Sequence, residues 1–311
     1  SRESAYGFKY MMYYLGNIRV PIAKGADLSV AGQYTVRNGN AMPLLEFSGN
    51  ETYGIHNALT FWWLNSVDTA PQNGGRSTVS NFRGWHIHSY GFYGYPMNDV
   101  VFDGFTLHNE KSVLSNSAEW VIGLWFGDYL AQKVVIRNAD IQGFRTGFVD
   151  PFFGGSTTVL ENSYLRNSTN IAVRSIGAPG SAPVGSWHEA KSLIIRNVRF
   201  GDASQWNLGG LQPANIVMDY TDHNGTANLI ASDTVFVYDY NGVAGDNFQI
   251  FYNEQRPDFI VPQSTSNLVG APVAGLTNQQ AWNQYGIAIA GSVASNTTTR
   301  ALIRGLLRST P

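Results

Sequence analysis

One column of ionisable side chains alternates in sign and stands immediately before the Gly or Asn that ends a short apolar run: Asp103, Arg137, Glu161 and Arg196. If these runs are parallel strands stacked about 4.8 Å apart, the column has two interpretations. In the first, the side chains form cross-strand ion pairs that each contribute at most about 1 kcal/mol. In the second, Asp103 and Glu161 lie roughly 9–10 Å apart and flank a sugar, as in an inverting glycosidase. Arg137 between them could instead polarise a uronate for a lyase or an epimerase.

A His-x-His pair is the second candidate site. His86 and His88 flank Ile87, so strand alternation places both imidazoles on one face and Ile87 on the other. Two imidazoles on one face suit a shared metal ion or an acid/base site. His108 follows the next apolar run and is the best third metal ligand. The alternative interpretation is a set of ordinary outward-facing histidines.

The third candidate site is a group of aromatic residues in the first half of the chain, predicted to bind sugar: Trp62, Trp63, Trp85, Tyr93 and Trp125. Exposed aromatic rings pack against the apolar faces of sugar rings, although aromatic residues also fill protein interiors. Trp62 and Trp63 are adjacent, so they cannot both point inward from a regular strand. We expect one groove to join these segments, with Asp103 and Asp128 as acid/base candidates.

An internal repeat predicts how these residues are positioned. Five eight-residue segments align in one register, each an apolar run with a turn residue at the fifth position and an apolar residue at the last: 100–107, 134–141, 158–165, 193–200 and 229–236. The aligned turn residues are Gly104, Asn138, Asn162, Asn197 and Asp233, and fainter copies lie near Asn50 and Asn81. Repeats of a few tens of residues indicate a solenoid, and Asn, Asp and Gly tolerate the left-handed backbone of a tight corner. We therefore predict an all-β fold, a right-handed parallel β-helix of about seven coils.

The pattern divides the chain into three parts. Residues 1–260 form the β-helix, with strands and a polar loop over 1–40 and the coil stack over 41–260. The Pro- and Ser-rich segment 261–276 is predicted to be a linker. Residues 277–311 are predicted to form a cap containing a helix, because Trp282, Tyr285 and Ile289 recur at helical spacing. A cap would protect the open last coil from edge-to-edge pairing.

Composition excludes several classes of function. The net charge of −2 gives no reason to expect a nucleic-acid partner, and the absence of cysteine excludes disulfides and thiolate metal sites. No apolar run reaches the ~18 residues of a membrane span. The low charged fraction of 14% and the 33 glycines are typical of a turn-rich extracellular β protein. The chain begins in strand-like sequence without a signal peptide, so we expect an upstream domain in the same precursor.

The rungs VVFDGF, VVIRNADI and LIIRNVRF, with the segments 46–54, 59–64 and 278–291, resemble the C-terminal β-helix of secreted bacterial proteins. Those proteins are similar to the animal cell-surface proteins that bind or depolymerise hyaluronan. The resemblance covers most of residues 6–308. It implies an extracellular carbohydrate-facing role and transfers no catalytic motif.

The expected function is therefore that of a secreted or cell-surface protein that binds, and in one alternative depolymerises, a polysaccharide. As an enzyme it would be a hydrolase or a lyase, and the sequence identifies no cofactor. Two other classes stay open: a structural or adhesive surface protein without catalysis, and an extracellular metal-binding protein that uses His86 and His88. A cleft with converging titratable groups would favour the enzyme, whereas a shallow aromatic strip would favour the binding protein.

Overall fold

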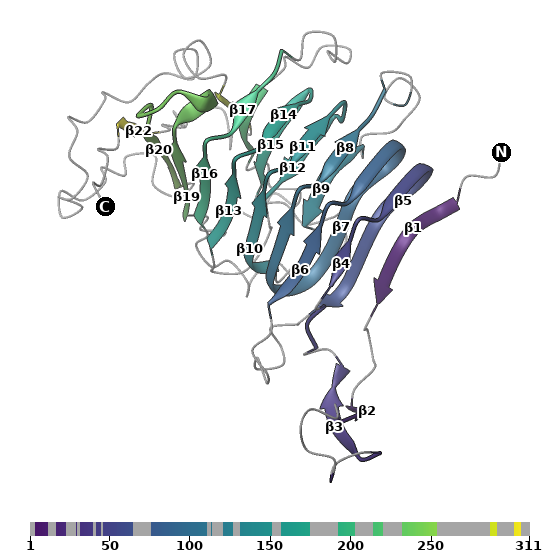
Figure 1. Cartoon of the computed structure of the whole chain (residues 1–311). Coiled ribbons are helices and arrows are strands. Elements are labelled where there is room, and N and C mark those ends of the chain that lie inside the picture. The colour runs from purple at the N-terminus through teal and green to yellow at the C-terminus, as the bar shows by residue number, and fades with distance from the viewer. Residues whose placement is uncertain are drawn as a thin grey trace, which may run out of the picture.

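The described residues form a large sheet of mostly parallel strands (Figure 1). The computed structural model describes residues 4–11, 17–22, 29, 32–39, 42–44, 46–64, 76–110, 113, 121–126, 131–150, 157–174, 192–202, 214–219, 232–253, 287–290 and 302–305. Successive strands return to the same position after each circuit of the chain, so that three ladders of parallel strands run along the stack. This solenoid-like arrangement is compatible with the predicted β-helix.

The first ladder carries the predicted repeat. It consists of β4 (Phe47–Ser48), β6 (Ser77–Ser80), the end of β7 (Arg83–Asp103), β10 (Ala131–Arg137), β13 (Thr157–Glu161), β16 (Ser192–Arg196) and β19 (Ser232–Tyr238). Ile136 pairs with Leu160, and Leu160 pairs with Ile195. All three side chains are buried in the core, as the repeat predicted. The apolar side of each strand is thus covered by the strands before and after it.

A left-handed corner follows each strand of the first ladder. Seven residues take positive φ there: Gly49, Asn81, Gly104, Asn138, Asn162, Asn197 and Asp239. Their φ angles lie between 50° and 71°, a range that Gly and Asn adopt more readily than branched residues. The predicted corner at Asp233 is wrong, because Arg196 pairs with Tyr238 and Asp239 therefore occupies the corner. Gly49 likewise takes the position expected for Asn50.

The second ladder follows these corners. Its strands are the beginning of β5 (Glu51–Leu64), the beginning of β7, β8 (Thr106–His108), β11 (Asp140–Gln142), β14 (Tyr164–Arg166) and β17 (Arg199–Phe200). Leu107, Ile141 and Leu165 form its inner column and are fully buried. Their neighbours in sequence point outward and create two columns of polar and aromatic side chains.

Buried asparagines complete the backbone hydrogen bonding where the second ladder ends. Asn109 accepts a bond from the Ile87 amide at 2.6 Å and donates to the Ile87 carbonyl at 2.8 Å. Asn167 accepts from the Phe144 amide at 2.9 Å and donates to the Ile141 carbonyl at 3.0 Å. A buried amide side chain therefore replaces the water that backbone groups at a corner otherwise need.

The third ladder closes each circuit. It contains β1 (Ser4–Met11), the end of β5, the middle of β7, β9 (Ile122–Phe126), β12 (Thr146–Val149), β15 (Thr169–Arg174), β18 (Ala214–Asp219) and β21 (Ile287–Ala290). Inside, Phe92 packs against Phe61, Phe102 and Phe126 with ring centroids 4.7–5.6 Å apart. This part of the interior is therefore a phenylalanine cluster within a core that also contains many Val, Ile and Leu residues.

At the C-terminal end, strands occupy the described parts of the predicted cap. β21 pairs parallel with β18, so Ile287–Ala290 form a strand and the predicted helix is wrong for these residues. β20 (Phe248–Asn253) pairs antiparallel with β19 and with β22 (Leu302–Gly305). A 3₁₀ turn, η4 (Tyr240–Gly242), precedes β20. The linker 261–276, Trp282 and Tyr285 lie outside the described residues.

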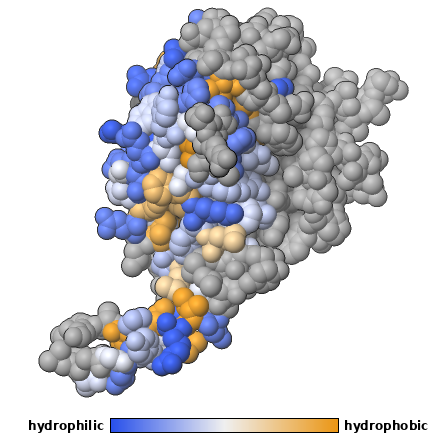
Figure 2. All heavy atoms as spheres, turned by 90° about the vertical axis from the view of Figure 1, so that its right-hand side faces the viewer, coloured by the Kyte–Doolittle hydropathy of each residue, from blue (hydrophilic) through white to orange (hydrophobic). Residues whose placement is uncertain are grey.

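A hairpin of β2 (Asn17–Pro21) and β3 (Tyr34–Asn38) projects from the stack (Figure 1). Tyr34 and Val36 are both 56% exposed on it, and Figure 2 shows hydrophobic residues beside strongly hydrophilic ones on this projection. β1, by contrast, pairs with β5 and belongs to the main stack. Within the described ranges, no helix has the length and apolar character that a membrane span requires.

Candidate functional site

The alternating charges predicted for the first ladder form cross-strand ion pairs. Arg137 Nη2 lies 2.8 Å from Asp103 Oδ2, and Arg196 Nη1 lies 3.4 Å from Glu161 Oε2. Asp103 also accepts a hydrogen bond from Asn138 Nδ2 at 2.8 Å. Each carboxylate is thus held by cationic or amide donors of the next strand. This arrangement favours the interpretation of the column as a stabilising ladder.

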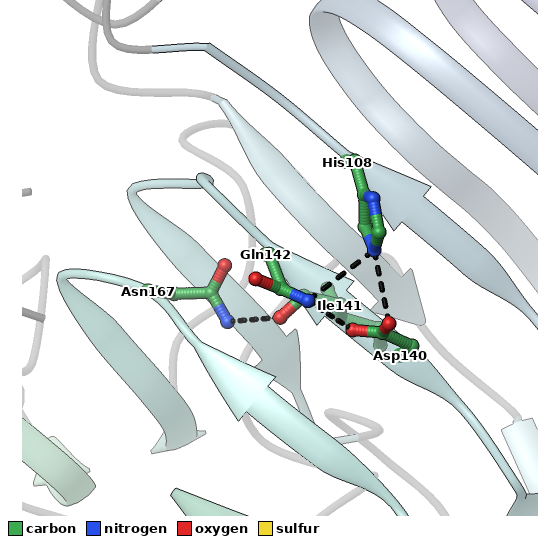
Figure 3. A network of polar contacts seen from close by, with 5 residues as sticks. All are labelled: His108, Asp140, Ile141, Gln142 and Asn167. Atoms are coloured by element: carbon green, nitrogen blue, oxygen red, sulfur yellow. Dashed lines mark hydrogen bonds and ion pairs between the residues drawn. The ribbon is translucent and has the colours of Figure 1, made fainter. Parts of the chain in front are cut away.

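The outward face of the second ladder carries a different constellation, which Figure 3 shows from close by. His108 of β8 lies directly beside Gln142 of β11 in the register. His108 Nε2 is 3.1 Å from Asp140 Oδ2, and Gln142 Nε2 donates to Asp140 Oδ1 at 2.6 Å. Both oxygens of Asp140 therefore accept hydrogen bonds from neighbouring side chains.

These contacts determine the charge state of Asp140. Partial burial on its own raises the pKa of this carboxyl group, but the hydrogen bonds from His108 and Gln142 lower it. The positive charges of His108 and Arg166 act in the same direction, and the net result is a pKa below the ordinary value. Asp140 is therefore a carboxylate at neutral pH and acts as a hydrogen-bond acceptor only.

The residues around this pair extend along the ladder. Trp85 pairs with His108 on one side, and Gln142 pairs with Arg166 on the other. In the neighbouring outward column, Arg83 pairs with Thr106, which pairs with Asp140. The face thus combines an aromatic ring, an imidazole, a carboxylate and guanidinium groups along successive strands. Such a combination suits an acidic ligand better than a basic one.

His86 and His88 lie near the end of the second ladder. Ile87 between them is fully buried, and the two imidazole centroids are 5.0 Å apart. His86 takes a positive φ of 52°, stacks on Tyr53 at 5.7 Å, and places Nδ1 3.8 Å from Glu110 Oε1. The two imidazoles therefore lie close to one another, although the left-handed backbone at His86 departs from regular strand alternation.

The described ranges contain no group of three or more His, Asp or Glu side chains that could hold a metal ion. His86, His88 and His108 all lie in these ranges. His108 is engaged with Asp140, and the neighbour of His88 on its other side is His56, with ring centroids 6.0 Å apart. The structure thus gives the predicted three-histidine site no support.

An unbroken strip of aromatic side chains lies on the third ladder. Its rings touch in sequence across β5, β7 and β9: Trp62, Tyr95, Tyr93, Trp125 and Tyr90. Consecutive ring centroids are 4.8–6.2 Å apart. All five side chains are partly exposed. We call these five residues the aromatic strip.

The ends of the aromatic strip differ in their surroundings. At the Trp62 end, the Lys9 ammonium lies 4.4 Å from the indole centroid. At the other end, Tyr90 and Trp125 pack against a small buried cluster of Ile122, Val149 and Ala172. A positive charge therefore stands at one end, while apolar packing holds the rings at the other.

The structure distributes the predicted site residues over three ladders. Asp103, Arg137 and Glu161 lie on the first, Trp85 and His108 on the second, and Trp62, Tyr93 and Trp125 on the third. Trp63 follows the third ladder with a positive φ of 65°, and its side chain is also partly exposed. Asp128 lies outside the described residues. The predicted residues thus lie on three different ladders and not on a single one.

Asp140 and Gln142 were not predicted as site residues, because the repeats were compared for charged residues only at the corner column. The signal was present, because Asp140 and Gln142 stand at the same offsets from Asn138 as Thr106 and His108 do from Gly104. Extending the alignment past each corner would have placed Gln142 beside His108.

Comparison of this chain with protein-family models, with curated proteins and with solved structures found no match. The resemblance to hyaluronan-related proteins is therefore not supported by these comparisons. The surfaces of the three ladders are therefore the basis for proposing a function.

Proposed function

We propose that this chain is an extracellular, right-handed parallel β-helix of about seven coils that binds a polysaccharide along the aromatic strip. The single observation behind the proposal is the run of ring contacts from Trp62 through Tyr95 and Tyr93 to Trp125 on the outward side of three neighbouring strands. Contiguous aromatic surface that is even partly open to solvent often marks a binding site, so this row of partly exposed rings is a candidate ligand surface.

Stacking against sugar rings suits such a surface. Tyr and Trp present a flat apolar face to the C–H groups of a pyranose, and their polar atoms hydrogen-bond the hydroxyls. The strip spans three neighbouring strands about 4.8 Å apart, and three of its rings lie along β7, so an extended sugar chain lying across the strip meets several rings. Several weak contacts on one chain then add through tethering.

The Lys9 ammonium at the Trp62 end favours an acidic polysaccharide. Lys9 Nζ lies over both Tyr6 and Trp62, 4.3 and 4.4 Å from their ring centroids. A uronate or sulfate group on a sugar bound to Trp62 therefore meets a positive charge, which strengthens binding at low ionic strength.

Binding to a panel of immobilised acidic and neutral polysaccharides tests the proposal. We expect the wild type to bind at least one acidic polysaccharide, and Trp62→Ala and Tyr93→Ala to weaken binding at least tenfold. Tyr34→Ala is the matched control, because Tyr34 is an exposed aromatic residue on the projecting hairpin. Thermal unfolding of each variant establishes that it folds.

The outcomes separate the candidate functions. Loss of binding in the strip variants with binding kept in Tyr34→Ala supports the proposal. A wild type that binds no polysaccharide of the panel contradicts it and favours a structural or adhesive surface protein.

A further inference from the structure

We propose that His108 and Asp140 form a general-base dyad that cleaves a uronate-containing polysaccharide by β-elimination. The choice of a polysaccharide substrate rests on the proposed function, whereas the dyad itself rests on a different face of the molecule. His108 and Asp140 lie on the second ladder, and the aromatic strip lies on the third.

The hydrogen bonds fix the tautomer of His108. Because Asp140 is ionised, it can only accept, so the 3.1 Å contact requires a proton on His108 Nε2. The Gln142 amide satisfies the other carboxylate oxygen at 2.6 Å and holds Asp140 in place. Figure 3 shows Asp140 facing both His108 and Gln142. In the neutral imidazole the lone pair then stands on Nδ1.

That lone pair is accessible. Among the described residues, Nδ1 of His108 has no hydrogen-bond partner, since the contacts to Asp140 and Gln142 both use Nε2. The His108 side chain is 37% exposed. A carboxylate that holds one imidazole nitrogen protonated while the other faces solvent is the arrangement that a general base requires.

The surrounding side chains suit a uronate. Trp85, one strand before His108, provides a ring for stacking. Arg166, whose positive charge acts on Asp140, and Arg83, on the same face, provide positive charge for the substrate carboxylate. The low acidity of the C5 proton is the main obstacle to elimination. Neutralising the adjacent carboxylate makes that proton more acidic.

Hydrolysis by a carboxyl pair fits this face less well. Glycosidases place two carboxyl groups roughly 5–9.5 Å apart, and one of them must act as an acid. In the described strands of the second ladder the other carboxylate is Glu51, three strand spacings or about 14 Å from Asp140. Asp140 is also ionised at neutral pH, so it cannot donate the proton that hydrolysis needs.

The elimination step balances without a cofactor. His108 Nδ1 removes the C5 proton of the uronate, and the C–H electron pair forms the C4=C5 double bond. The bond between C4 and the glycosidic oxygen breaks, and its electron pair stays on that oxygen. The imidazolium of His108 returns the proton to the oxygen, which becomes a hydroxyl group. The products are an unsaturated uronate end and a shortened chain.

The test measures the ultraviolet absorbance of C4=C5 ends formed from polygalacturonate, alginate and hyaluronan by the intact chain. We expect the wild type to form unsaturated ends from at least one of them, and His108→Ala to reduce kcat about 100-fold or more. Asp140→Asn is expected to lower kcat with KM nearly unchanged, because Asp140 positions the imidazole and does not touch the substrate. Asp103→Asn is the control, since Asp103 belongs to the ion pairs of the first ladder.

Failures of the two proposals have different signatures. Binding without unsaturated ends on any of the three polysaccharides overturns the dyad and leaves the proposed function intact. Unsaturated ends formed at the wild-type rate by His108→Ala also overturn it, as do new reducing ends without a double bond. If the wild type forms product and Trp62→Ala has the same KM as the wild type, the proposed role of the aromatic strip is overturned. The dyad then stays intact.

Discussion

Asn197 donates a hydrogen bond from its Nδ2 to Oδ1 of Asn162 at 2.9 Å, although 35 residues separate the two in the sequence. Both take a φ of 50°. The side chain of one corner is thus tied to the next, and the left-handed backbone that each corner needs is stabilised by its neighbour. Asn138 differs, because its amide bonds Asp103.

The left-handed backbone at Asn162 predicts that a glycine variant is more stable than a valine variant. Asn162→Gly keeps the positive φ without strain and should change the free energy of unfolding by less than about 1 kcal/mol. Asn162→Val adds a branched side chain to a left-handed residue and should destabilise by about 1–2 kcal/mol more. Urea unfolding measures both, with Thr157→Val on the exposed part of β13 as control. Equal destabilisation by Gly and Val would contradict the corner assignment.

Core packing predicts a contrast between adjacent residues of β13. Leu160 is fully buried between Ile136 and Ile195, so Leu160→Ala should destabilise by about 2–5 kcal/mol. Val159 points the other way and is partly exposed, and Val159→Ala should cost clearly less. Thermal or urea unfolding compares the two. A larger loss of unfolding free energy for Val159→Ala than for Leu160→Ala would contradict the assignment of inward and outward faces in the first ladder.

Substitution of the buried Asn109 should destabilise the fold more than substitution of most other polar residues. It is 7% exposed and bonds both the amide and the carbonyl of Ile87. Asn109→Leu leaves both backbone groups unpaired and should destabilise by several kcal/mol, at about 1–3 kcal/mol per group. Asn50→Ala removes one solvent-exposed bond, to the Ser48 carbonyl, and serves as control. Similar stability of the two variants would show that Asn109 does not complete the corner.

The lowered pKa of Asp140 predicts a pH-dependent contribution to stability. Because the pKa is lower in the folded than in the unfolded chain, this carboxylate stabilises the fold above the ordinary Asp value of about 3.9. The contribution is lost as the pH falls through the lowered value. The pair is more than one-third exposed, so we expect at most about 1 kcal/mol. Asp140→Asn should therefore be less stable than wild type near pH 6, and the difference should shrink progressively as the pH falls below about 4. A gap that widens on acidification would contradict the direction of the shift.

The repeat made the first ladder predictable because every corner there needs a left-handed residue, and Asn and Gly mark it in the sequence. Asp233 misled the alignment because the segment before it alternates in the same way as the one before Asp239. A shift of an even number of residues keeps every side chain on its predicted face. Only the pairing of Arg196 with Tyr238 distinguishes the two registers.

The other two ladders were harder to predict. β7 runs from Arg83 to Asp103 through all three ladders, and its left-handed residues, His86 and Asp99, do not belong to the series of Gly and Asn that marks the first ladder. Trp62, Tyr93 and Trp125 of the aromatic strip were predicted as members of one aromatic group, but their separation from Trp85 depends on where this long strand bends. In the predicted cap, Ile289 fits a helical spacing, yet the run Ile287–Ala290 pairs with β18 as a strand. Pairing to an exposed edge outweighs a local helical pattern of a few residues.

The dependence of affinity on oligosaccharide length tests the central claim most directly. Calorimetric titration of the wild type with an acidic oligosaccharide series should give a dissociation constant that falls with each added sugar and then levels off once the aromatic strip is covered. The same series with Trp62→Ala should level off at a shorter length and weaker affinity, because one end of the strip is gone. An affinity independent of length, or no binding at any length, would contradict a polysaccharide bound along the strip.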